Sequence, residues 1–95
     1  MSQEEAERIE KILAELGICK FQGRKVTLSE EILRVALSTR AESRYSVAME
    51  IVAKKRRETG YTGLSDDELD RVVHYLSTIF WFMEKKQEEG SLQPA

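Results

Sequence analysis

The sequence predicts an all-α fold, a small bundle of three to four helices with either a short β-hairpin or a loop at residues 18–27. Three observations carry this prediction. Apolar residues recur at helical spacing, serine or threonine precedes glutamate by three positions at the start of each repeat, and glycines follow two of the repeats. The 95 residues allow a single domain, which we place at 1–90, followed by a flexible tail at 91–95.

The first helix is expected between Ser2 and Leu16. Ser2 and Glu5 have the spacing of a capping box, and apolar side chains then recur at positions 9, 12, 13 and 16. Gly17 follows at the position where helices favour a residue in the left-handed conformation. The sequence therefore defines both ends of this helix.

Residues 18–27 fit either an irregular loop or a hairpin, and we favour the loop. Two short arms, 18–21 and 24–27, flank Gln22 and Gly23, a link that suits a tight turn. A hairpin of this size is only marginally stable alone and needs a surface to pack on. In the loop interpretation, the apolar side chains of this segment lie under the helices.

The middle of the chain fits one helix or two. A second helix begins near Thr27 or Ser29, and a further helical repeat starts at Tyr45. Between them no glycine or proline forces a break, so residues 28–59 also fit a single long helix. Basic residues at positions 54–57, followed by Gly60, mark the C-terminal end of this helical segment in either case.

The last helix has the strongest start signal in the chain. Ser65 and Glu68 form a capping box, and Leu64 and Leu69 take the positions of a hydrophobic staple. We expect this helix to cover residues 66–88.

This last helix is apolar on nearly all sides. Four of the seven aromatic residues lie between Tyr75 and Phe82. Such a helix is either enclosed by the rest of the domain or paired with another chain, and we favour pairing of two copies in a homodimer. The predicted protein interface consists of Leu76, Ile79, Phe80, Trp81, Phe82, Met83 and Tyr75.

A net charge of −2 conceals a cationic band in the middle of the chain. The net charge is −3 over residues 1–19, +6 over residues 20–57 and −5 over residues 58–95. The band either pairs internally with the acidic ends or meets an acidic protein or nucleic acid phosphates. The predicted basic patch consists of Arg24, Lys25, Arg34, Arg40, Arg44, Lys54, Lys55, Arg56 and Arg57.

A DNA-binding regulator of the helix-turn-helix type is the alternative interpretation. The two middle helices would form the pair, and Arg44, Tyr45 and Ser46 would reach base edges and phosphates. The segment between these helices contains no glycine, although the turn of this motif often has one, and this weakens the interpretation.

No motif indicates an enzyme. His74 is the only histidine, and its pairing with Asp70 on one helical face is typical of a surface ion pair. The chain has no glycine-rich phosphate loop, and its acidic residues at 66–70 lack the spacing of a calcium loop. We therefore predict no catalytic residues, cofactor, metal site or small-molecule substrate.

The cysteine content and the N-terminus suggest a cytoplasmic protein. The single cysteine, Cys19, excludes an intrachain disulfide and suits a reducing compartment. The acidic N-terminus does not resemble a targeting peptide, and no apolar run approaches the about 18 residues of a membrane span. We expect a non-enzymatic interaction or regulatory protein that binds itself or an acidic protein and no membrane.

Overall fold

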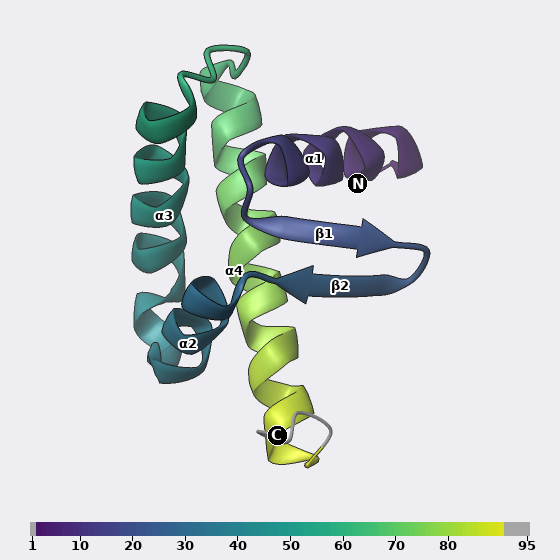
Figure 1. Cartoon of the computed structure of the whole chain (residues 1–95), viewed down its shortest axis with the longest axis vertical. Coiled ribbons are helices and arrows are strands. Elements are labelled where there is room, and N and C mark those ends of the chain that lie inside the picture. Colours follow the sequence, from purple (N-terminus) through teal and green to yellow (C-terminus); the bar gives the residue numbers. More distant parts are fainter. Residues whose placement is uncertain (1, 91–95) are drawn as a thin grey trace.

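The structure, a computed structural model, describes residues 2–90, and the predicted tail at 91–95 lies outside this range. Within it the chain forms four α-helices, one short 3-10 helix and a two-stranded antiparallel hairpin (Figure 1). The mostly helical fold is confirmed. At residues 18–27, however, the chain forms the hairpin and not the loop that we favoured.

Helix α1 (Gln3–Glu15) begins and ends at its sequence signals. The Ser2 hydroxyl accepts a hydrogen bond of 3.2 Å from the Glu5 amide. After the last turn, Gly17 has a φ of 75°, a conformation that costs glycine little. The chain reverses at this glycine and enters the hairpin.

The hairpin consists of β1 (Cys19–Gln22) and β2 (Lys25–Leu28), with Cys19 opposite Leu28. Gly23 lies in its turn with a φ of 61°. Strand β1 packs against α1, and both Cys19 and Leu28 are buried. The helices thus supply the packing surface that an isolated hairpin lacks.

The middle of the chain forms two helices, and not one. Helix α2 (Glu30–Ser38) starts after Ser29, whose hydroxyl caps it. Thr27, the other predicted start, lies in β2. The 3-10 helix η1 (Ala41–Ser43) leads into α3 (Arg44–Thr59).

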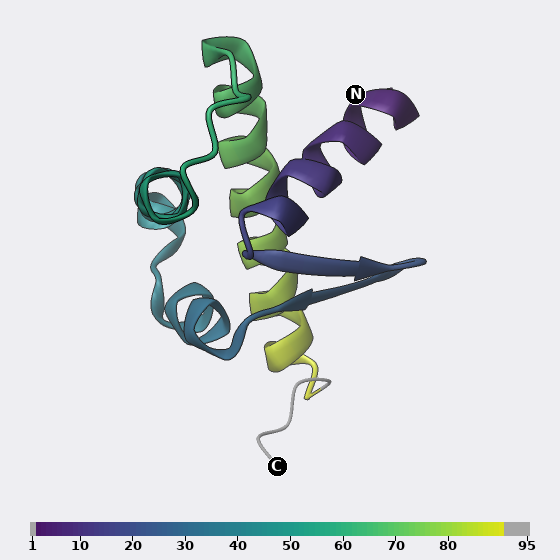
Figure 2. The ribbon, with the colours of Figure 1, turned by 45° about the horizontal axis from the view of Figure 1, so that its top comes forward.

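Helix α4 (Asp66–Glu88) has the predicted bounds and is the central element of the fold (Figures 1 and 2). The Glu68 amide donates to the Ser65 hydroxyl at 3.2 Å, and the Ser65 amide donates to the Glu68 carboxylate at 3.4 Å. Helix α3 runs along one side of α4, while α1 and the hairpin cross its other side. No helix within residues 2–90 combines the length and apolar character needed to cross a bilayer.

The core lies between α4 and the elements around it. Helix α4 supplies six buried side chains, namely Val72, Val73, Leu76, Ile79, Phe80 and Met83. Leu76, Ile79, Phe80 and Met83 were predicted to form the interface, but they belong to this core instead. Their helical spacing places them on the side of α4 that the other elements cover.

Candidate functional site

Two aromatic side chains remain on the surface of α4. Trp81 is 46% exposed and Phe82 is 45% exposed, whereas Phe80 is completely buried. Consecutive residues of a helix are rotated by about 100° from one another, so three in a row cannot all face one core. Among residues 2–90, Met49 on α3 is the third large apolar side chain that is exposed.

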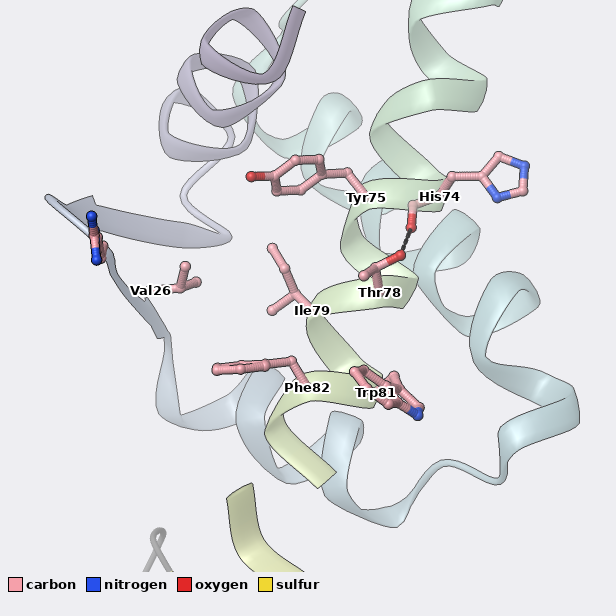
Figure 3. A pocket seen from close by; sticks show the side chains of 8 residues that line it. Val26, His74, Tyr75, Thr78, Ile79, Trp81 and Phe82 are labelled. Carbon is pink, nitrogen blue, oxygen red and sulfur yellow. Dashed lines mark hydrogen bonds between the residues drawn. The ribbon is translucent and has the colours of Figure 1, made fainter. Parts of the chain in front are cut away.

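A groove of about 470 Å³ separates this part of α4 from the hairpin (Figure 3). Val26 of β2 forms one wall, and Tyr75, Ile79 and Phe82 of α4 form the other. We call this feature the α4 groove. Its lining consists of Arg24, Val26, His74, Tyr75, Thr78, Ile79, Trp81 and Phe82. The groove is therefore mostly apolar and contains no carboxylate.

Tyr75 is held in a fixed position in the wall of the groove. Its hydroxyl donates a hydrogen bond of 2.7 Å to Glu10, and its ring meets that of Phe21 edge-on, with 6.4 Å between centroids. Burial, followed by the hydrogen bond to Glu10, raises the pKa of the Tyr75 phenol. These contacts form the wall before any partner binds.

A second hollow of about 460 Å³ lies on the other flank of Trp81, toward the start of α3. Its lining consists of Ala41, Arg44, Tyr45, His74, Ser77, Thr78 and Trp81. His74, Thr78 and Trp81 line both hollows and form a ridge between them. The Ser77 hydroxyl donates to the His74 carbonyl at 2.8 Å, and the Thr78 hydroxyl donates to the same carbonyl at 3.0 Å (the latter bond in Figure 3), so neither is left without an acceptor.

The C-terminal part of the groove has a cationic rim. The Lys85 ammonium lies 6.0 Å from the centroid of the Trp81 ring, and that of Lys86 lies 5.2 Å from the centroid of Phe82. Exposed contacts of this kind contribute about 0.5–1 kcal/mol. Within residues 2–90, neither Lys86 nor Arg24 forms an ion pair.

The nine residues of the predicted basic patch do not come together. Arg24 and Lys25 lie at the turn of the hairpin, on the side of α4 away from α3 (Figures 1 and 2). Four others are paired with carboxylates: Arg34 with Glu30, Arg44 with Glu84, Lys54 with Glu31 and Lys55 with Glu58. Arg40, Arg56 and Arg57 form no ion pair with the rest of the described chain. Ion pairs within the chain thus involve four of the nine residues of the basic patch.

Two of the three residues predicted to contact DNA face α4 instead. The Arg44 side chain is 18% exposed and pairs with Glu84. The Tyr45 hydroxyl donates a hydrogen bond of 2.6 Å to Asp70, and of the three residues only Ser46 is exposed. Carboxylates beside Arg44 and Tyr45 repel phosphate groups, so this geometry does not favour a recognition helix.

The side chains with acid–base or thiol chemistry that the sequence singled out are His74, Asp70 and Cys19. His74 Nε2 and Asp70 Oδ1 lie 3.7 Å apart, and both side chains are exposed. Burial raises the pKa of the Cys19 thiol to about 12, which keeps it protonated and unreactive at neutral pH. Within residues 2–90, no three histidine, cysteine or acidic side chains are placed to hold a metal ion.

The predicted protein interface did not include Val26, His74 or Thr78, which also line this surface. His74, Thr78, Trp81 and Lys85 follow one another at spacings of four, three and four residues, which is a second helical stripe beside the apolar one. That stripe was enough to predict that His74 and Thr78 share a face with Trp81. No local pattern predicts the position of Val26, because it depends on how the hairpin packs.

No family model, curated protein or solved structure matches this chain. The residues described above are therefore the basis for its functional interpretation.

Proposed function

We propose that this chain is a non-enzymatic interaction protein that self-associates through the exposed aromatic face of α4. This face consists of His74, Thr78, Trp81 and Phe82 and the two hollows beside them. One observation supports the proposal above the others: Trp81 and Phe82 stay about half exposed beside a mostly apolar groove. A surface of this kind typically marks an interaction site.

The two rings supply much of the free energy that association needs. Complete burial of a large apolar side chain contributes about 1.5–3 kcal/mol, so covering four half-exposed rings of two copies contributes about 3–6 kcal/mol. Association costs at least about 4 kcal/mol in lost translational and rotational freedom. A dimer with a micromolar dissociation constant needs a net of about 8 kcal/mol, so the groove walls must contribute at least about 6 kcal/mol more.

The shape of the face suits a symmetric pair. In a two-fold dimer the same surface of each copy meets itself, which closes the assembly at two chains. Ser77 and Thr78 are small side chains beside Trp81 and allow a second helix to approach. The hollow on each flank of the Trp81 ridge leaves room for an aromatic side chain of the other copy.

Sedimentation equilibrium of three variants tests this proposal. Trp81→Ala and Phe82→Glu should each shift the protein toward monomer, and the new carboxylate at position 82 lies four residues before Lys86, a helix-stabilising spacing. Met49→Ala is the matched control, since it removes an exposed apolar side chain from α3. A wild type that is monomeric at high micromolar concentration contradicts the proposal, as does equal weakening in all three variants.

The other parts of the predicted function have less support. Binding of an acidic protein by the basic patch is supported by Arg24 and Arg40, which form no ion pair within residues 2–90. Four of the nine residues of the patch, however, already form ion pairs within the chain. The DNA-binding alternative gains no support from the positions of Arg44 and Tyr45. A cytoplasmic location remains part of the proposal because Cys19 is a free thiol.

A further inference from the structure

Exposed charged residues lie at both ends of the aromatic face of α4. Asp67 and Asp70 are exposed near its start, and Lys85 is exposed near its end, where it also forms an ion pair of 3.4 Å with Glu88. Trp81 and Phe82 lie between these ends. Asp70 already accepts a hydrogen bond from Tyr45, but a carboxylate has about four acceptor sites, so it can bind a further cation.

We propose that two copies of the chain pair antiparallel along α4, crossing between Ser77 and Thr78, with Lys85 of each copy against Asp70 of the other. This inference rests on the self-association proposed above and adds the orientation and the charge contacts. The occupant of the aromatic face is thus a second copy of this chain.

The spacing of the charged residues fits this crossing. With a rise of 1.5 Å per residue, Asp70 and Lys85 both lie about 11 Å along the axis from a crossing between Ser77 and Thr78. In an antiparallel pair, Asp70 of one copy is then level with Lys85 of the other.

The aromatic residues fit the same register. His74 and Trp81 are each about 5 Å from the crossing, so the Trp81 ring of one copy is level with the His74 ring of the other. The hollow of about 460 Å³ beside Ser77 lies next to that position and can receive the indole. The small side chains at the crossing bring the two helix axes close enough for this contact.

A parallel pair lacks this complementarity. It would place Lys85 against Lys85 and Asp70 against Asp70, and opposed like charges cost free energy. The antiparallel pair has two like-charged levels, Asp67 against Glu88 and Asp66 against Glu89, about 16 and 17 Å from the crossing. Helices that cross at about 20° have separated by several ångströms there, which weakens the repulsion.

Charge exchange tests the orientation. Asp70→Lys and Lys85→Glu should each weaken the dimer about tenfold or more, which corresponds to about 1.4 kcal/mol, because each puts like charges together twice. The double variant D70K/K85E exchanges the two signs and should return to within about threefold of wild type. In a parallel pair the single variants replace one repulsion by another, and the double variant restores nothing.

Two controls isolate the charge effect. Tyr45→Phe removes the hydrogen bond to Asp70 without changing any charge. Because Tyr45 also lines the hollow beside Ser77, its effect on dimerisation measures these uncharged contacts alone, and it should stay well below the tenfold weakening expected of Asp70→Lys. Lys20→Glu makes the same charge change as Lys85→Glu but on β1, outside the residues that line either hollow beside Trp81. It should have no more effect than Tyr45→Phe.

Distances between spin labels give a second readout. In a Cys19→Ala background, Glu89→Cys introduces a labelling site near the end of α4, and circular dichroism confirms that the variant is folded. The labels of an antiparallel pair are about 35 Å apart along the axis, whereas those of a parallel pair lie within about 20 Å.

The outcomes separate this inference from the proposed function. Weakening by both single variants, recovery in the double variant and the long distance support the antiparallel pair. A dimer whose dissociation constant does not change in the charge variants, or whose spin labels lie within the short distance, overturns the antiparallel orientation but is still consistent with self-association. A wild type that stays monomeric at high micromolar concentration overturns both.

Discussion

The Tyr75 hydroxyl donates a hydrogen bond of 2.7 Å to the Glu10 carboxylate, and this bond joins the middle of α4 to α1 across 65 positions of sequence. Tyr75 also lines the α4 groove, so the same side chain links the packing of the fold to the shape of the proposed interface.

Tyr75→Phe should lower the free energy of unfolding by about 1 kcal/mol, because it leaves the Glu10 carboxylate without its donor. The ring and its edge-on contact with Phe21 are retained. Glu10→Gln, which keeps an acceptor, should cost less. Urea unfolding monitored by circular dichroism measures both, and an unchanged stability in Tyr75→Phe would show that the bond contributes nothing in solution.

Ser65→Ala should destabilise the chain by about 1 kcal/mol, since it removes the hydroxyl that accepts from the Glu68 amide. For a domain of this size the melting temperature should fall by about 4–8 °C. Ser46→Ala is the matched control on the exposed surface of α3. If both variants melt alike, the capping box does not stabilise α4.

Arg44→Ala should destabilise the chain more than Arg34→Ala does. The Arg44 side chain is 18% exposed in its pair with Glu84, whereas the Arg34 side chain is 77% exposed in its pair with Glu30. An exposed pair at this helical spacing contributes about 0.3–0.5 kcal/mol, whereas removing Arg44 leaves the partly buried Glu84 carboxylate without its partner, which costs more. If chemical denaturation shows that the two variants lose the same free energy of unfolding, this expectation is wrong.

Stability should fall as the pH rises from about 9 to about 12. Burial raises the pKa of the Cys19 thiol from 9.0 to about 12, so over this range the unfolded chain binds fewer protons than the folded one. Cys19→Ala should flatten this decline relative to wild type. Urea unfolding at a series of alkaline pH values tests the difference, and parallel curves would show that the thiol titrates normally.

The helices were predictable because their signals are local. The hydroxyl of Ser65 and the carboxylate of Glu68 sit three positions apart, so the sequence alone indicates where α4 begins. Gly17 likewise marks the end of α1 by its position after the last apolar residue. These signals act over a single turn and need no tertiary packing.

The hairpin depends on distant contacts, and a distant contact also joins the start of α3 to α4. Each strand has four residues, and burial of Cys19 and Leu28 under the helices stabilises them. Pairing of Arg44 with Glu84 spans 40 positions and no local pattern announces it. For this reason the sequence alone did not determine either feature.

The same distinction applies to the candidate site. The sequence placed the aromatic residues correctly on one helix, but adjacent positions such as Phe80 and Trp81 differ only in which neighbour covers them. The elements packed around α4 bury the first ring and leave the second exposed. Separating core from surface therefore required the arrangement of all four helices.

The emission of Trp81 as a function of protein concentration tests self-association most directly. Trp81 is the only tryptophan in the chain and is 46% exposed in the single copy. Burial in a dimer should move its emission to shorter wavelength, with a midpoint that equals the dissociation constant from sedimentation equilibrium. Emission that stays constant up to high micromolar concentration, together with the mass of a monomer, would contradict self-association through α4.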